Sequence, residues 1–258
     1  AVVLFGLNIA LAADVLAGAR PEFILAGFIP GAPILLGAEP LGVIFGLVAS
    51  GLWIVTSVYA IGYMRGKHEA KQTRFYTFFA IALASTMGVA YSGNLISLFI
   101  FYEALSLSTY PLVTHHNNDE ARKGGRTYLG VLLTTSIGFF LFGVLWVWHE
   151  AGTVAFTPGG VFSGQTDPVL IAALLALFVF GIGKAGVMPF HRWLPAAMVA
   201  PTPVSALLHA VAVVKAGVFS ILKVTVYIFG VDFLAATPST DFFLWVAAAT
   251  ILIASIIA

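Results

Sequence analysis

Charged side chains stand inside apolar runs that are long enough to cross a lipid bilayer. Lys184 and Lys215 lie in the stretch 180–215, and Glu103 lies in the apolar run 95–113. A charge at the centre of a bilayer costs about 2.5 to 3.5 kcal/mol on insertion scales, so such residues usually belong to an ion or proton pathway. The pattern predicts a membrane protein that moves ions or protons, and it restricts the fold to helices or a closed barrel.

The composition agrees with a membrane location. Of the 258 residues, 60% are hydrophobic and only 9% are charged, whereas soluble domains are about 25% charged. The chain has no cysteine, which excludes thiol chemistry, disulfides and cysteine-ligated iron–sulfur clusters within it. The net charge of +1 gives no argument for nucleic acid as a partner.

The apolar runs predict an all-α transmembrane bundle. They are continuously apolar, whereas the strands of a membrane β-barrel alternate apolar and polar residues. Measured against the roughly 20 residues that a helix needs to span, they give about eight helices, at 2–16, 41–62, 75–91, 95–113, 128–148, 169–187, 204–229 and 242–258. The first and last runs lack polar flanks, so we expect the chain to be a fragment of a longer protein.

Loop charges predict the topology, because cytoplasmic loops collect Lys and Arg. Threading the eight runs alternately across the bilayer leaves only Arg20 on one side. It places on the other side Arg65, Lys67, Lys71, Arg74, Arg122, Lys123, Arg126 and Arg192. We therefore expect 65–74 and the loop 121–126 to face the cytoplasm, and 152–167 to face the opposite side.

Glu103 and Lys184 are the first candidates for proton transfer. A buried carboxylate either takes up a proton or finds a cation, and both responses suit such a group. A structural ion pair that joins two helices is the alternative. Lys184 stands among glycines, with Pro189 five residues later. Because proline has no N–H, we expect the helix to be interrupted between about 185 and 193, with the freed carbonyls facing polar groups or water.

The residues that would form this gate are Gly183, Gly186, Pro189, Pro201 and Pro203. The fragment GIGK lacks the remaining residues of a phosphate-binding loop, so nucleotide binding is rejected. Neither a cofactor nor a metal site is expected.

His209 and Lys215 follow on the next predicted helix. They are six residues apart, about 240° around the axis, so they do not share a face, but waters between helices could connect them. A neutral, hydrogen-bonded imidazole in a helix interface is the alternative for His209. Lys223 is interpreted as structural, with its stem reaching the interface. The loop around His115 and His116 is interpreted as a solvated turn.

Three segments resemble one known family. The stretch GKAGVMPFHRWLPAAMVAPTPVSALLHAVAVVKAG, together with SVYAIGYM (57–64) and FYEALSLSTYPL (101–112), is similar to the antiporter-like proton-translocating subunits of respiratory complex I, membrane-bound hydrogenases and Mrp cation/proton antiporters. The resemblance implies a fold of about fourteen helices with two inverted repeats. It also implies that Glu103 is the channel glutamate, Lys184 the central lysine on a broken helix, and Lys215 with His209 the next pair.

On this alignment the chain is expected to contain three parts. Residues 1–74 would hold a truncated second helix and the third helix, 75–230 the first ion-translocation repeat, and 231–258 the start of the second repeat. The resemblance implies a subunit without a redox centre of its own, in a bacterial or archaeal cytoplasmic membrane. Its partners would be the lipid bilayer, other membrane subunits, and protons or Na⁺.

Three functions are compatible with the resemblance. The first is a subunit of a redox-driven proton pump, in which partner subunits transfer electrons. The second is a subunit of a secondary Mrp-type antiporter without redox work. The third is a scaffold with a vestigial ion pair, which the retained set Glu103, Lys184 and Lys215 disfavours.

Overall fold

The computed structural model describes residues 1–162, 166–207, 212–237 and 239–257, and most of them are helical. His209 lies outside the described residues. The helices of the first half are α1 (Val2–Leu16), α2 (Pro40–Gly66), α3 (Gln72–Ala90), α4 (Leu95–Val113) and α5 (Asp119–Thr135), which continues through the π-helical segment η1 (Ser136–Leu141) into α6 (Phe142–Ala151). The second half contains α7 (Pro168–Gly181), the 3-10 turn η2 (Gly183–Ala185), α8 (Trp193–Ala196), η3 (Ala197–Val199), α9 (Thr202–Ala206), α10 (Val213–Val224) with η5 (Thr225–Phe229), α11 (Val231–Ala235) and α12 (Ser239–Ile257).

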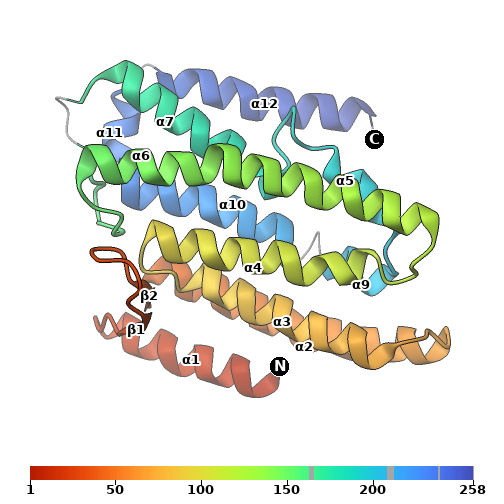
Figure 1. Cartoon of the computed structure of the whole chain (residues 1–258). Helices are drawn as coiled ribbons and strands as arrows, with labels where there is room; N and C mark the ends of the chain where they lie inside the picture. The colour runs from red at the N-terminus through yellow and green to blue at the C-terminus, as the bar shows by residue number, and fades with distance from the viewer. Residues whose placement is uncertain (163–165, 208–211, 238, 258) are drawn as a thin grey trace.

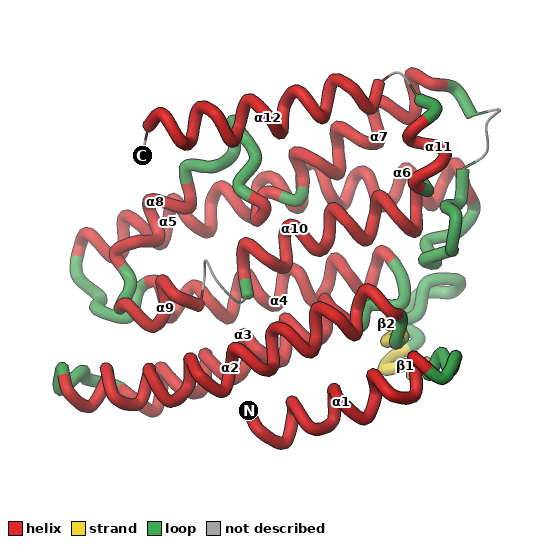
Figure 2. The backbone as a smooth tube through the Cα atoms, turned by 180° about the vertical axis from the view of Figure 1, so that it is seen from behind, coloured by secondary structure: helices red, strands yellow, loops and turns green. Residues whose placement is uncertain are grey.

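The long helices run side by side as a bundle (Figure 1). α1 packs on α2 at one edge, α3 packs on α4, and α12 packs on α7 at the opposite edge. The view from behind shows α10 between α4 and the pair α6 and α7 (Figure 2). By length and composition, three helical stretches in the described part of the chain can cross a membrane: Pro40–Gly66, Leu95–Val113 and Asp119–Ala151.

The bundle has two chemically different ends. The connections α2–α3 and α4–α5 meet at the first end, which we call the basic end. Arg74, at the start of α3, donates there to the carbonyl of His115, which follows α4, at 3.0 Å. At the second, the opposite end, an isolated bridge joins Asn94 to Ala155, and the N–H of Val161 donates to the carbonyl of Ile228 at 2.8 Å.

A small β-hairpin at the opposite end corrects the all-α prediction. β1 (Glu22–Ala26) pairs antiparallel with β2 (Ile34–Gly37), and the hairpin lies near the start of α2 (Figure 2). The chain between the two strands, GFIPGAP, is rich in the glycine and proline that make turns. The two apolar strands are far shorter than the roughly 20 residues of a membrane span, so a prediction based on long apolar runs does not detect them.

The predicted loop 121–126 is also wrong, because these residues belong to α5. The helix begins at Asp119, and the side chain of its N-cap, Asn118, accepts a hydrogen bond from the N–H of Ala121 at 2.7 Å. Asp119 and Glu120 in the first turn suit the positive end of the helix dipole. The N-cap and the two acidic residues therefore start the helix at Asp119, ahead of the apolar run 128–148 from which the span was predicted.

Candidate proton-transfer site

Lys184 is fully buried in the centre of the bundle. Its Nζ donates hydrogen bonds to the carbonyl of Tyr102 at 2.8 Å and to the hydroxyl of Ser106 at 2.5 Å. It also lies 3.2 Å from the centroid of the Tyr102 ring, where a cation is attracted to the π face. The acceptors around the amine are thus neutral oxygens and an aromatic face, which stabilise a proton on it without a direct ion pair.

Two of these contacts come from one turn of α4. Tyr102 and Ser106 are four residues apart, so they lie on the same face of the helix, and that face packs toward η2. The Tyr102 hydroxyl accepts a hydrogen bond from the backbone N–H of Lys184 at 3.0 Å. Sequence reasoning missed both residues. The available signal was their i, i+4 spacing on either side of Glu103 in an apolar helix.

Glu103 lies beside this arrangement without touching the amine. Its charge is near enough to act on Lys184, Tyr102 and Tyr128, but the ion pairs formed by the described residues do not include it. Both carboxylate oxygens are buried and have no hydrogen-bond partner among those residues. Burying a carboxylate is costly unless it is paired or hydrogen-bonded.

The chain around Lys184 departs from helical geometry. α7 ends at Gly181, η2 holds the lysine, and residues 186–192, with Pro189 among them, lie outside the helices. Gly186 has φ +73°, a left-handed conformation that favours glycine. The carbonyl of Gly183 accepts two hydrogen bonds, from the N–H of Gly186 at 3.0 Å and from Nε1 of the buried Trp193 at 2.9 Å. The interruption begins earlier than predicted, before the lysine instead of after it.

Pro201 and Pro203 mark the start of α9. Pro201 is its N-cap residue, and its carbonyl accepts from Val204 at 2.8 Å and from Ser205 at 3.1 Å. Both prolines are buried. They lie in a different segment from Gly183 and Gly186, so the structure distributes the predicted gate residues over the two sides of α8 and η3.

α10 brings a glycine against the lysine backbone. A Cβ on Gly217 would lie 2.5 Å from the carbonyl carbon of Lys184 and 2.9 Å from Cα of Ala185. Lys215, two residues earlier, has an exposed side chain in a groove between α2 and α10 that is otherwise lined by apolar residues. The structure therefore separates Lys215 from Lys184 and places it on the outer face of α10.

The structure corrects one part of the interpretation of Lys223, the exposure of the end of its side chain. Lys223 does not reach the interface: its side chain is fully buried, and it forms an ion pair with Glu39. Glu39 was not singled out in the sequence. It comes directly before Pro40, at the start of a predicted span, and an acid in that position was the only signal.

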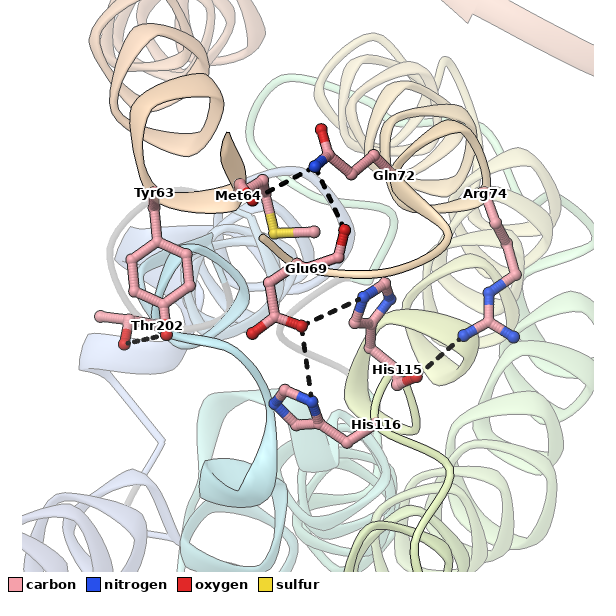
Figure 3. A network of polar contacts seen from close by, with 8 residues as sticks. All are labelled: Tyr63, Met64, Glu69, Gln72, Arg74, His115, His116 and Thr202. Carbon is pink, nitrogen blue, oxygen red and sulfur yellow. Dashed lines mark hydrogen bonds and ion pairs between the residues drawn. The ribbon is translucent and has the colours of Figure 1, made fainter. Parts of the chain in front are cut away.

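The basic end carries a polar network instead of a solvated turn (Figure 3). The Glu69 carboxylate lies 4.0 Å from Nε2 of His115 and 3.7 Å from Nδ1 of His116. His115 is buried, and burial lowers its pKa, with a further lowering by the charge of Arg74 and an opposite effect of Glu69. Burial and the cation outweigh the carboxylate, so this imidazole resists protonation.

A known protein family matches the part of the chain that contains these buried charges. The profile of the family described as "NADH:quinone oxidoreductase/Mrp antiporter, TM" matches residues 92–258, which include Glu103, Lys184 and Lys223. The chain belongs to this family. It is therefore an integral membrane protein, as the embedded charges and the apolar runs predict.

Two curated relatives are parts of antiporters. The chain is 32% identical over 185 residues to the A/B subunit of a probable K(+)/H(+) antiporter from Rhizobium meliloti, an alignment that covers 70% of this chain and 18% of the relative. It is 29% identical over 199 residues to the A1 subunit of a Na(+)/H(+) antiporter from Staphylococcus aureus, covering 72% and 23%. The chain thus spans about a fifth of the length of these relatives.

Two solved structures share the fold. The Mrp complex from Dietzia sp. DQ12-45-1b superposes with a TM-score of 0.76 and 24% identity, covering 93% of this chain and 26% of that one. The membrane-bound sulfane sulfur reductase, an archaeal respiratory membrane complex, gives 0.72 and 23%, covering 85% and 45%. At these identities the similarity shows the fold alone.

Proposed function

We propose that this chain carries a proton-translocation unit of a cation/proton antiporter complex in the membrane. The observation that carries the proposal is the fully buried Lys184, held by neutral oxygens near the Glu103 carboxylate, whose buried oxygens have no hydrogen-bond partner among the described residues. The antiporter subunits among the relatives support the cation/proton class. A buried amine and a nearby buried carboxylate can each hold a proton, and neither needs a cofactor to do so.

The proposed mechanism uses the charge of one group to set the proton affinity of the other. An ionised Glu103 stabilises the protonated amine of Lys184, and protonating Glu103 weakens that stabilisation, so the lysine then releases its proton. The two charge states form a two-state element that an event in a partner subunit can bias. Ser106 and the Tyr102 carbonyl keep the amine in place through both states.

The finer architecture is part of the proposal. We take the long helical segments as about eight spans, the interruption at 182–192 as a discontinuous helix at membrane depth, and 75–230 as the first translocation repeat, with 1–74 before it and 231–258 opening a second. Gly183, Gly186 and Pro189, with Pro201 and Pro203 beyond α8, would allow this segment to move. His209 and Lys215 are proposed as the next groups on the path from the family alignment alone, since the structure places the side chain of Lys215 on the outer face of α10.

The setting is proposed from the relatives. Both are subunits by name, so we propose further membrane subunits as partners, a bacterial or archaeal cytoplasmic membrane as the location, and Na⁺ or K⁺ as the exchanged cation. A redox-driven pump is the second candidate, because the fold is shared with an archaeal respiratory complex. Iron–sulfur or flavin subunits that co-purify with the chain would favour the pump.

Transport by the complete complex in proteoliposomes with an imposed gradient tests the proposal. We expect Glu103→Gln and Lys184→Ala each to lower the transport rate at least tenfold while the complex still assembles, as judged by size-exclusion chromatography. Glu150→Gln and Lys67→Ala are matched controls, because they remove the same charges from exposed positions. Near-normal transport by a well-assembled Glu103→Gln or Lys184→Ala complex would overturn the proposal and leave a structural role.

A further inference from the structure

A second lysine and carboxylate meet near the opposite end of the bundle. The fully buried Nζ of Lys223 pairs with Oε1 of Glu39 and donates to the carbonyls of Ser92 at 2.5 Å and Ala90 at 3.4 Å. The centroid of the Phe156 ring lies 4.7 Å from the amine. The proposed mechanism at Lys184 does not use this pair.

Three elements bring the pair together. Glu39 is the N-cap residue of α2, Lys223 lies in the last turn of α10, and Ala90 is the last residue of α3, with Ser92 two residues beyond it. Carbonyls at the end of a helix carry a partial negative charge. The site therefore gives a protonated lysine several acceptors, only one of which, the carboxylate, can take its proton.

The carboxylate faces a cavity and the amine does not. A cavity of about 370 Å³ opens at this end, and its wall includes Arg20, Glu22, Glu39, Phe156, Pro158 and Tyr227. The side chain of Glu39 is 18% exposed, whereas that of Lys223 is 0% exposed. Glu39 is thus the group of the pair that solvent in the cavity can reach.

The same helix connects this pair to Lys184. Gly217 packs against the backbone of Lys184, and Lys223 follows six residues later, about 9 Å along the axis of α10. The buried Ser220 lies between them on α10, and its hydroxyl donates to the carbonyl of Ala216 at 2.7 Å. Two buried lysines are therefore associated with α10: Lys223 belongs to it, and the backbone of Lys184 packs against it. Each lysine has a carboxylate nearby.

We propose that Glu39 and Lys223 form a second proton-exchange site, which connects the interior of the bundle to the aqueous face at the opposite end. The Lys223 ammonium gives its proton to the Glu39 carboxylate, which leaves a neutral amine and a carboxylic acid. Water in the cavity then takes the proton from Glu39, and the amine is reprotonated from the interior. Transfer in the other direction runs through the same steps in reverse. This site rests on the proposed translocation function and extends it.

A purely structural ion pair is the competing explanation, and a double variant separates the two. Replacing a buried pair by neutral residues of similar volume is often neutral or stabilising, so Glu39→Gln/Lys223→Met is expected to assemble. If the pair exchanges protons, this complex transports at least tenfold more slowly than the parent. If the pair only joins α2 to α10, it transports normally. Glu22→Gln, an exposed acid in the wall of the same cavity, is the matched control and should keep the parental rate.

A second test leaves the ion pair intact. Because the chain has no cysteine, Pro158→Cys places its only thiol in the cavity wall, and Thr157→Cys places one on the exposed neighbour outside the wall. A membrane-impermeant, positively charged thiol reagent should slow transport several-fold in Pro158→Cys and not in Thr157→Cys or in the parent. Equal transport by labelled and unlabelled Pro158→Cys would overturn the proposal, even if the double variant failed to assemble.

The variants at Lys184 keep the two proposals distinguishable. Loss of transport in Lys184→Ala together with normal transport in assembled Glu39→Gln/Lys223→Met would overturn the second site alone. Normal transport in Lys184→Ala would remove the translocation function on which both depend.

Discussion

Lys184 and Tyr102 hold each other through two hydrogen bonds that run between different atoms. The lysine Nζ donates to the tyrosine carbonyl at 2.8 Å, and the lysine backbone N–H donates to the tyrosine hydroxyl at 3.0 Å. The first bond fixes the end of the side chain, and the second fixes the turn from which that side chain starts. α4 therefore positions both the backbone and the charge of η2, without a direct contact from Glu103.

The two bonds have separable consequences. Tyr102→Phe leaves the backbone N–H of Lys184 without its acceptor, and a buried unsatisfied donor costs about 1 to 3 kcal/mol. We expect a lower melting temperature of the complex with transport largely retained, because the Tyr102 carbonyl stays. Ser106→Ala removes an acceptor of the ammonium, so it should change the transport rate more than the melting temperature. Ser108→Ala, a buried serine of the same helix, is the control. Equal effects of the three variants on both readouts would contradict this separation.

Glu103 and Lys184 should behave as one unit in transport. If the charge of one sets the proton affinity of the other, removing either disables the same step. Glu103→Gln/Lys184→Ala should therefore be little slower than the slower single variant, since residues of one network are not additive. Multiplying the two single losses predicts a far slower double variant, and observing that product would show two independent roles. The measurement is the transport rate per assembled complex.

The sequence predicts the buried charges better than it predicts their partners. Lys184 and Glu103 are recognisable because each is an ionisable residue in a long apolar run, and the interruption near Lys184 follows from its glycines and Pro189. The ion pair of Lys223 with Glu39 is not recognisable. It joins the end of α10 to the start of α2, and no local pattern relates positions so far apart in the chain.

Side-chain direction was the other missing information. Lys215 looks equivalent to Lys184 in hydropathy, yet its side chain is exposed in the groove between α2 and α10, while Lys184 is enclosed. The helix α7 that leads to Lys184 is apolar on every side, so no polar stripe indicates which of its faces turns inward. The hairpin at 22–37 and the capped start of α5 were missed because hydropathy over a span does not register a short strand or a single N-cap.

Gly217 should tolerate no side chain. A Cβ there would overlap the backbone of Lys184 and Ala185, and overpacking of this kind typically costs about 1 to 3 kcal/mol. Gly217→Ala should therefore lower the melting temperature of the complex. Gly62→Ala is the control, since a Cβ on Gly62 in α2 meets nothing within 4 Å and alanine favours a helix by about 0.5 to 1 kcal/mol. A Gly217→Ala complex as stable as Gly62→Ala would show that α10 does not pack this closely on η2.

The two ends of the bundle should face opposite sides of the membrane. The positive-inside rule places the α2–α3 connection in the cytoplasm and residues 152–167 outside. In whole cells an impermeant thiol reagent should label Thr157→Cys and leave Lys67→Cys unlabelled, and both positions are exposed. Permeabilised cells, in which both should react, control for accessibility. Labelling of Lys67→Cys but not of Thr157→Cys from outside would contradict this prediction and show that the chain has the opposite orientation in the membrane.

His115 should make the basic end sensitive to acid. Its pKa is lowered from the ordinary value of 6.5, first by burial and then by Arg74, while Glu69 acts in the opposite sense and His116 lowers it further. A histidine with a lowered pKa binds protons less readily in the folded state than in the unfolded chain. As the pH falls below about 6.5, the unfolded state gains protons that the folded state does not, so stability is lost on acidification.

We therefore expect the melting temperature of the complex to fall between pH 7.5 and pH 5.5, and we expect His115→Gln to reduce that fall. The amide of glutamine does not titrate, so it removes the difference in proton uptake between the two states. His149→Gln, at an exposed position in α6, should leave the pH dependence unchanged. If His115→Gln kept the parental difference between the two pH values, or if the parent were more stable at pH 5.5, the network of Glu69, Arg74, His115 and His116 would not be acid-labile.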